Sequence, residues 1–235
     1  MSWIITGSEK YETDPYRSQV SLLLHGDGTN GSNTIVDSSP SPKTVTAVGN
    51  AQISTAQSKF GGASIAFDGS GDYLGLPAVS DLAFGTGNFT VETWVYISSY
   101  APINGYALID TIPIGGLGSR LAAFVWVILP SGKLDVFSLS SFKGSSTSIV
   151  PLNQWVHLAL VRNGAIWQYY INGVKDGTEY TYSRDLSLAQ GALIGRIGDG
   201  NTYFFNGYID DFRITKGIAR YTTNFTPPSA PFPDI

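Results

Sequence analysis

The chain has 235 residues, of which 43% are hydrophobic and only 14% are charged, and its formal net charge is −4. This composition supports a sizeable core, and the negative charge argues against the broad basic surface that nucleic-acid-binding proteins use. The sequence contains no cysteine, so disulfides, thiolate catalysis and zinc–thiolate sites are excluded.

The N-terminal segment, residues 1–18, is a polar arm without a hydrophobic period, although it carries Trp3, Tyr11 and Tyr16. Its first residues, MSWIITGSEK, have neither the basic start nor the long apolar stretch of a secretory signal. No later stretch approaches the about 20 apolar residues of a membrane-spanning helix. We therefore expect a protein made in a cytoplasm, without membrane insertion, whose arm orders on a partner.

From Val20 onward, short apolar or alternating segments are separated by turns rich in glycine and asparagine. The clearest pair is WVHLALVRNGAIWQYYINGV, two strands joined around Asn163 and Gly164. No segment sustains a helical period. The pattern predicts an all-β sandwich, with strands at 20–26, 43–49, 63–69, 72–76, 89–97, 107–110, 120–129, 133–140, 154–162, 165–171, 192–198 and 208–215.

The last predicted strand contains two adjacent aspartates, although strands disfavour aspartate. With a period of two, Asp210 shares a face with Tyr208 and Phe212, whereas Asp211 lies beside Arg213 on the other face. The two carboxylates would then point in opposite directions and could not act as an acid–base pair. We expect Asp210 to be structural, with a cation, an arginine or several backbone N–H groups satisfying its charge. We expect Asp211 and Arg213 to form an exposed pair.

Aromatic side chains are the candidates for ligand contacts. Trp94 and Tyr96 share one face of their strand with Glu92, and Trp167 and Tyr169 share a face in the hairpin. Rings beside a carboxylate can form a platform that stacks on sugars and hydrogen-bonds to their hydroxyl groups. These four aromatic residues are therefore the predicted glycan contacts.

Four segments have a familiar order and spacing: FGGASIAFDGSGDYLGLP, GNFTVETWVYI, NQWVHLALVRNGAIWQYYINGV and NGYIDDFRIT. Together they resemble laminin-G-like and pentraxin-like domains of the concanavalin A-like lectin/glucanase superfamily, over roughly residues 20–225. The resemblance implies a two-sheet antiparallel jelly roll whose N- and C-terminal strands pair. It also implies packing positions for Trp94 and Trp155, which is the alternative to a glycan contact at Trp94. The opening LLLHGDG and closing GIARYTTNFTPP resemble domains of bacteriophage virion proteins.

Many members of the resembled family hold calcium through loop carboxylates and carbonyl oxygens. The candidates here are Asp210, Asp27 and Asp68, with Asp72 beside Asp68 in FDGSGD, although this segment is also typical of a tight Asp-Gly turn. We expect no required cofactor, and calcium only as a structural addition.

Some members of the superfamily cleave glycans with paired carboxylates on one strand. No two of the four glutamates here lie in one predicted core strand, and no nucleophile elbow accompanies His25 or His157. We therefore expect a non-enzymatic structural or adhesion protein at the surface of a phage particle, with recognition of a host glycan as the alternative and glycan cleavage as a third hypothesis. The jelly roll is expected at 19–221, between the arm at 1–18 and a Pro-rich tail at 222–235. Both ends would contact other virion proteins or sister subunits in a homo-oligomer, without nucleic acid.

Overall fold

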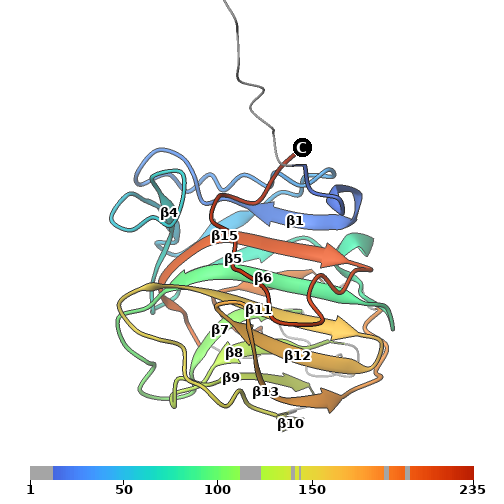
Figure 1. Cartoon of the computed structure of the whole chain (residues 1–235). Helices are drawn as coiled ribbons and strands as arrows, with labels where there is room; N and C mark the ends of the chain where they lie inside the picture. Colours follow the sequence, from blue (N-terminus) through green and yellow to red (C-terminus); the bar gives the residue numbers. More distant parts are fainter. Residues whose placement is uncertain (1–12, 112–122, 139–140, 143, 188–190, 199–201) are drawn as a thin grey trace, which may run out of the picture.

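The computed structural model describes residues 13–111, 123–138, 141–142, 144–187, 191–198 and 202–235, and shows two antiparallel sheets stacked face to face (Figure 1). The first sheet has the strand order β13 (Val174–Thr181), β12 (Ile166–Ile171), β11 (Trp155–Asn163), β6 (Phe89–Tyr96), β15 (Asn206–Lys216), β4 (Ser64–Asp68) and β3 (Gln52–Ser54), and β1 (Val20–Leu24) also pairs with β15. The second sheet has the order β10 (Ser141–Phe142), β9 (Leu134–Ser138), β8 (Val125–Ile128), β7 (Tyr106–Asp110), β14 (Ala192–Ile194), β5 (Tyr73–Leu76) and β2 (Thr46–Val48). The predicted all-β, two-sheet antiparallel sandwich is confirmed.

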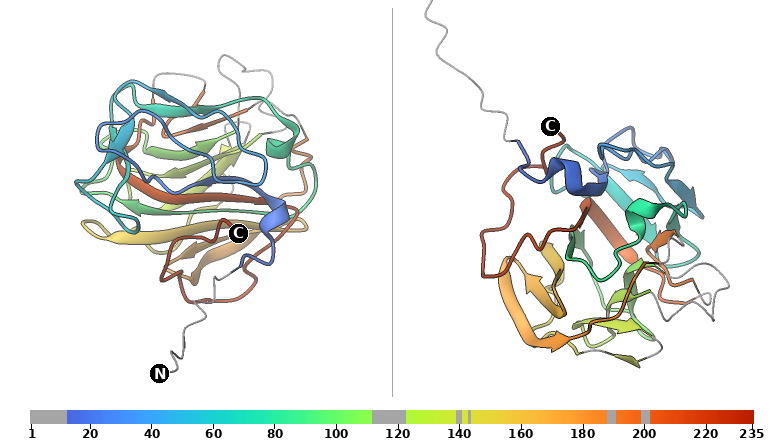
Figure 2. Two further views of the ribbon diagram at one scale, coloured as in Figure 1. Left: turned by 90° about the horizontal axis from the view of Figure 1, so that it is seen from above. Right: turned by 90° about the vertical axis from the view of Figure 1, so that its right-hand side faces the viewer.

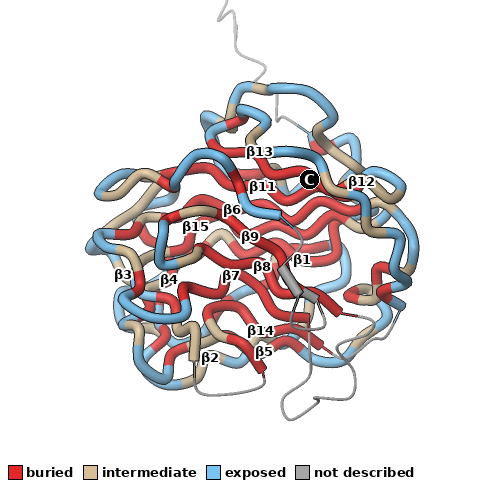
Figure 3. Tube along the Cα trace, turned by 90° about the horizontal axis from the view of Figure 1, so that it is seen from below, coloured by how far each residue is buried: buried red, intermediate tan, exposed pale blue. Residues whose placement is uncertain are grey.

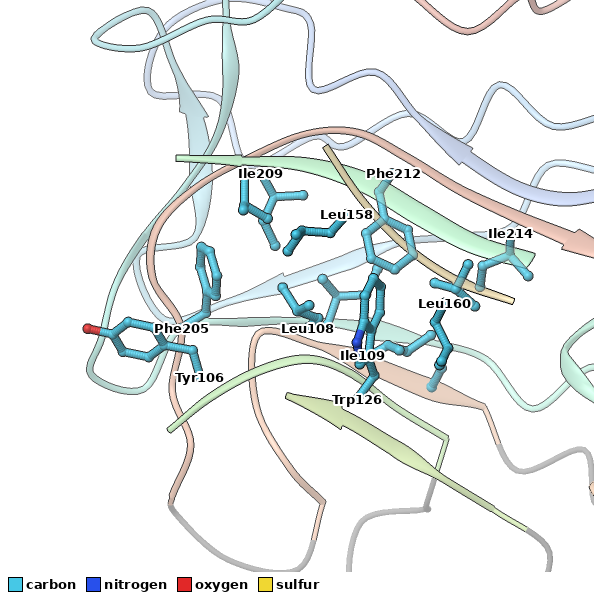
Figure 4. Packing of buried hydrophobic residues seen from close by; sticks show 14 of the residues in the cluster. Tyr106, Leu108, Ile109, Trp126, Leu158, Leu160, Phe205, Ile209, Phe212 and Ile214 are labelled. Carbon is cyan, nitrogen blue, oxygen red and sulfur yellow. The ribbon is translucent and has the colours of Figure 1, made fainter. Parts of the chain in front are cut away.

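The core lies between the two sheets. Leu158, Leu160 and Phe212 of the first sheet and Trp126 of the second are all 0% exposed and belong to one continuous cluster (Figure 4). Burial follows the strands, and the exposed residues gather in the connections (Figure 3). Removal of this apolar surface from water is the main force that holds the sheets together.

The first and last strands of the domain lie side by side. β1 pairs with the C-terminal half of β15, where Leu24 is opposite Phe212. The N-terminal half of β15 pairs with β4, where Ile209 is opposite Ile65. This arrangement agrees with the pairing of terminal strands that the resemblance implied.

The C-terminal segment folds back over the outer face of the first sheet, which is the face turned away from the second sheet (Figures 1 and 2). Phe232 is 3% exposed and packs against Val20 and Leu23 of β1. The N–H group of Asp14 donates to the carbonyl oxygen of Ile235 at 3.2 Å. Residues 222–235 were predicted as a Pro-rich tail outside the jelly roll, with Phe232 as an anchor for a partner. In the structure Phe232 is buried against β1 and is therefore not free to act as such an anchor. Residues 1–12 of the predicted arm lie outside the described residues.

Three strands were not predicted from the sequence, and one of them is the two-residue β10, which lies at an edge of the second sheet. β13 includes residues expected in a turn, because its polar sequence and Gly177 give no apolar alternation on an exposed edge. β3 is short and lies at the other edge of the first sheet. Helical structure among the described residues is limited to η1 (Arg17–Gln19) and η2 (Ser80–Leu82), and neither could cross a membrane.

Candidate functional site

One continuous row of side chains crosses the outer face of the first sheet. Strand register aligns its members in the order Gln52 (β3), Ala66 (β4), Tyr208 (β15), Tyr96 (β6) and Trp155 (β11). Their sequence neighbours in β6 and β15 are buried in the core, so this row faces away from the second sheet. All five side chains are at least partly exposed. We call them the open row.

A groove of about 530 Å³ runs along the open row from Gln52 to Tyr96, and Trp155 lies beyond its lining. The methyl group of Ala66 leaves space between the longer side chains of Gln52 and Tyr208. The ring centroid of Tyr96 lies 6.1 Å from that of Tyr208 and 5.8 Å from that of Trp155, so the three rings form one aromatic strip. Exposed polar side chains complete the lining: Asn50, Gln52, Asp68, Ser98 and Asn206.

Two turns beside the groove are fixed to each other by Asp72, which is 1% exposed. Its carboxylate accepts hydrogen bonds from the backbone N–H groups of Asn50 and Asp68. Asp68 accepts a hydrogen bond from the N–H group of Ser70 at 2.8 Å, as the predicted tight turn requires. At Gly49, where φ is +72°, a Cβ would lie only 2.4 Å from the Asp72 carboxylate. The wall of the groove is therefore rigidly held before any ligand binds.

The other half of the outer face is covered by chain termini and carries a buried ion network. Glu92 is 0% exposed and receives hydrogen bonds from Arg213 at 2.8 and 3.0 Å and from the hydroxyl group of Tyr221 at 2.7 Å. The Oδ2 atom of Asp14 lies 3.1 Å from Nη1 of Arg213 and 2.6 Å from Nη2 of Arg220. Burial alone would raise the pKa of Glu92, but Arg213, His157 and Arg220 hold this pKa far below its ordinary value. Glu92 is therefore an ion-paired carboxylate and not a proton donor.

A bulge in β15 changes the predicted orientation of the two adjacent aspartates. The register shifts between Asp210 and Arg213, and Asp211 has a φ of +48°. Asp210 therefore lies on the outer face opposite Trp94, whereas Phe212 turns into the core. The prediction that Asp210 shares a face with Phe212 is wrong, because strict alternation does not continue through a bulge.

Backbone N–H groups engage Asp210, which is one of the three arrangements that the sequence predicted for its charge, and its structural role stays a prediction. Its Oδ2 atom accepts hydrogen bonds from the N–H groups of Lys59 at 2.8 Å and Phe60 at 3.1 Å. Burial raises the pKa of Asp210 to about 7, despite the opposing effect of these two hydrogen bonds.

Asp211 does not pair with Arg213, which contradicts the predicted exposed pair. Asp211 is 0% exposed, its Oδ1 atom lies 2.6 Å from His25 Nδ1, and its Oδ2 atom accepts the N–H group of Phe232 at 2.8 Å. Burial would lower the pKa of His25, but the hydrogen bond and charge of Asp211 raise it overall. Asp211 therefore links the C-terminal segment at Phe232 to His25, the residue that directly follows β1.

The four predicted glycan contacts have different locations. Trp167 and Tyr169 are 0% and 1% exposed in the core, so the prediction that they bind sugar is wrong. Trp94 is 5% exposed and covered by Lys59, whose Nζ lies 4.0 Å from the ring centroid, and this agrees with a packing role. Tyr96 alone among the four lines the groove.

Sequence reasoning missed several residues of the groove. Tyr208 was considered only as a neighbour of Asp210, and Trp155, predicted only to pack, extends the aromatic strip beyond the groove lining. Asn50, Gln52 and Asn206 had no distinguishing motif. Cross-strand register brings them together, and register cannot be read from single strands.

The predicted calcium ligands do not form one site. Among the described residues, no group of three or more His, Asp or Glu side chains could hold a metal ion. Asp68 lies at the groove, Asp210 is engaged by two backbone N–H groups, and Asp27 is exposed. The described donor set therefore does not fit the predicted calcium, and we assign no role to a metal.

Comparison with known proteins places the chain among lectin-like domains. The Laminin_G_3 family model, described as the concanavalin A-like lectin/glucanases superfamily, matches residues 68–219. No curated protein sequence matches the chain.

Three solved structures show the same fold at low identity. Domain 4 of AbnA, a GH43 extracellular arabinanase from Geobacillus stearothermophilus, in complex with arabinotriose, has a TM-score of 0.59 and 20% identity, over 85% of this chain and 93% of that domain. The botulinum neurotoxin serotype D ligand binding domain, in complex with N-acetylneuraminic acid, has a TM-score of 0.61 and 19% identity, over 86% of this chain and 49% of the toxin domain. The binding domain of Paraclostridial Mosquitocidal Protein 1 has a TM-score of 0.60 and 16% identity, over 86% of this chain and 50% of that domain. This chain spans about half the length of the two toxin domains.

Proposed function

This chain belongs to the concanavalin A-like lectin/glucanases superfamily, and from that premise we propose that it is a non-enzymatic carbohydrate-binding module that takes up a glycan in the groove along the open row. We further propose that the module serves as an adhesion or structural component on the surface of a phage particle. The first part rests on the groove, and the second rests on the sequence motifs at the two ends of the domain.

The observation that carries the proposal is the aromatic strip of Tyr208, Tyr96 and Trp155 beside exposed amide side chains. Sugar rings present apolar C–H faces that stack on aromatic rings, and hydroxyl groups that need both donors and acceptors. Amide side chains supply both. Two neighbours of the same fold were solved with arabinotriose and N-acetylneuraminic acid bound, which supports carbohydrate as the class of ligand.

The engagement of the carboxylates supports a binding role and not a hydrolytic one. Glycosidases need two carboxyl groups on either side of the scissile bond, with one of them able to donate a proton. Glu92 is buried and ion-paired with Arg213. Asp210 is 1% exposed and accepts a hydrogen bond from the backbone N–H group of Lys59. At the groove, Asp72 is buried and holds two backbone N–H groups, which leaves Asp68 as the exposed carboxylate of the described lining.

A glycan array tests the binding proposal. We expect the wild type to bind at least one glycan, Tyr208→Ala to lose that binding, and Tyr16→Ala to retain it. Tyr16 is a matched control because it is 39% exposed and lies outside the groove lining. Retention of binding by Tyr208→Ala would contradict the assigned groove, and release of reducing sugar from the bound glycan would contradict the non-enzymatic role.

The phage context needs a separate test. We expect mass spectrometry of purified particles to detect the protein. We expect the protein to form a homo-oligomer, with a trimer as the expected state. Deletion of residues 1–12 should impair attachment or assembly and should leave the thermal unfolding midpoint unchanged. The deletion stops before Asp14, because Asp14 belongs to the buried ion network. Absence from particles would contradict the virion location. Normal attachment and assembly of the truncated protein would contradict a role for the arm.

A further inference from the structure

The open row is long enough for a chain of sugars. It crosses five strands, and neighbouring strands lie about 4.8 Å apart, so the row spans about 19 Å from Gln52 to Trp155. The successive aromatic centroids are 5.8 and 6.1 Å apart, so the aromatic surface continues from β15 across β6 to β11. A single sugar would contact only part of this strip.

Among the described residues, no further strand lies beyond either end of the open row, although the loop at Gly31 and Ser32 hydrogen-bonds to Ile53 along the outer edge of β3. Gln52 lies on β3, which is the edge of the first sheet. At the other end, β12 pairs with β11 only from Leu158 onward, so no strand lies beside Trp155. In the described part of the chain, a glycan that lies on the row could therefore extend past Trp155, and at the other end it would pass over the loop at Gly31 and Ser32.

The groove carries negative charge without a positive counterpart. Its described lining includes the carboxylates of Asp68 and Asp72 and no lysine or arginine. Recognition of an acidic sugar ordinarily uses a charge-assisted bond from arginine or lysine. A sugar carboxylate placed beside exposed Asp68 would instead meet a like charge. A neutral sugar avoids this repulsion and can donate its hydroxyl protons to Asp68.

From these three observations we infer that the groove binds an uncharged, extended oligosaccharide through several internal units and rejects acidic glycans. This inference rests on the proposed carbohydrate-binding function and adds the ligand class to it. It also separates this chain from the toxin domain solved with N-acetylneuraminic acid, which is an acidic sugar.

Affinity gel electrophoresis with matched neutral and acidic polymers tests the inference. The matched pair is hydroxyethyl cellulose with carboxymethyl cellulose, with galactan, arabinan and mannan as further neutral probes and polygalacturonate as a further acidic probe. We expect binding to at least one neutral polymer, at least about tenfold stronger than to its acidic counterpart where a pair exists. Calorimetry should then show that an oligosaccharide of that polymer binds at least about tenfold more tightly than its monosaccharide.

A charge substitution provides a test that does not endanger the fold. Gln52 is exposed on an edge strand, so Gln52→Lys should fold normally and place a cation at the groove. We expect it to raise affinity for the acidic polymers several-fold at low salt and to lose this gain at high salt. Gln19→Lys makes the same chemical change at an exposed site outside the groove lining and should change nothing.

The outcomes separate the inference from the proposed function. Stronger binding of an acidic polymer, with loss of binding in Tyr208→Ala, would overturn the inference and leave carbohydrate binding intact. Equal affinity for monosaccharide and oligosaccharide would overturn the internal mode of binding. An absence of binding to every polymer and to the glycan array would overturn the proposed function itself, and the inference with it.

Discussion

The outer face of the first sheet has two halves built on the same strands, β6, β11 and β15. Polar side chains are buried and paired in one half and exposed to solvent in the other. In the covered half, Glu92 and Arg213 are both under 5% exposed and satisfy each other beneath the terminal segments. In the open half, Gln52, Asp68 and Asn206 remain exposed around a groove. Buried charges that have partners contribute to a defined fold, whereas exposed polar groups beside aromatic rings remain available to a ligand. The covered half should therefore govern stability and the open half should govern binding.

The largest expected effect is at the centre of the covered half. Arg213→Ala should reduce the free energy of unfolding by about 3–5 kcal/mol, because it leaves Glu92 buried without its main counter-charge. Urea unfolding at pH 7 measures this change. The control Arg184→Ala removes an exposed arginine and should cost less than about 0.5 kcal/mol. A loss below about 1 kcal/mol in Arg213→Ala would show that the network is not structural.

Two matched tyrosines compare the halves directly. Tyr170 is 1% exposed, and its hydroxyl group donates to the carbonyl oxygen of Tyr221, so Tyr170→Ala should cost about 3–5 kcal/mol. Tyr208 lies in the open row, and Tyr208→Ala should cost less than half of that while abolishing glycan binding. Equal losses of stability in the two variants would remove the distinction between the halves.

The link between the C-terminal segment and β1 should also be strong. Asp211→Ala leaves His25 and the N–H group of Phe232 without their partner, and should cost about 3 kcal/mol. The exposed pair expected from the sequence would have made this substitution nearly neutral. Thermal unfolding monitored by circular dichroism distinguishes the buried link from an exposed pair. An unfolding midpoint close to that of the wild type would support the exposed pair of Asp211 and Arg213.

The bulge at Asp211 shows where sequence reasoning ends. Alternation predicted most strands, and Asn163 with Gly164 predicted the β11–β12 hairpin, because these signals are local. An aspartate at positive φ gives no comparable local signal, so the faces of Asp210 and Phe212 could not be assigned. The groove depends on register among several strands, and of its lining only Tyr96 was predicted as a glycan contact.

Stability should depend on pH in a way that Asp210 partly controls. Its pKa is raised to about 7, so the folded state binds this proton more tightly than the unfolded state, and stability is lost as pH rises from about 4 to 7. His25, whose pKa is also raised, adds a loss in the same direction through its folded pKa. Asp210→Asn keeps an acceptor for the two N–H groups and removes the charge. Its unfolding free energy should therefore fall less than that of the wild type between pH 5 and 8.

The covered half should produce the opposite slope in acid. The lowered pKa values of Glu92 and Asp14 mean that their contribution is present above their unfolded values and is lost as pH falls below about 4.5. Because the Asp210 contribution is already being lost above about pH 4, stability in the wild type should be greatest near about pH 4–4.5 and should fall on both sides. Parallel pH profiles for wild type and Asp210→Asn above pH 5 would contradict the assigned role of Asp210.

The central claim is that the open half binds a glycan while the covered half does not. Two-dimensional amide NMR during titration with the neutral oligosaccharide found by electrophoresis tests it most directly. We predict that the largest shift changes cluster at the groove, at Asn50, Gln52, Asp68, Ser98, Asn206 and Tyr208, with little change over residues 220–232. Shift changes concentrated over residues 220–232, or at the connections far from the open row, would contradict the account.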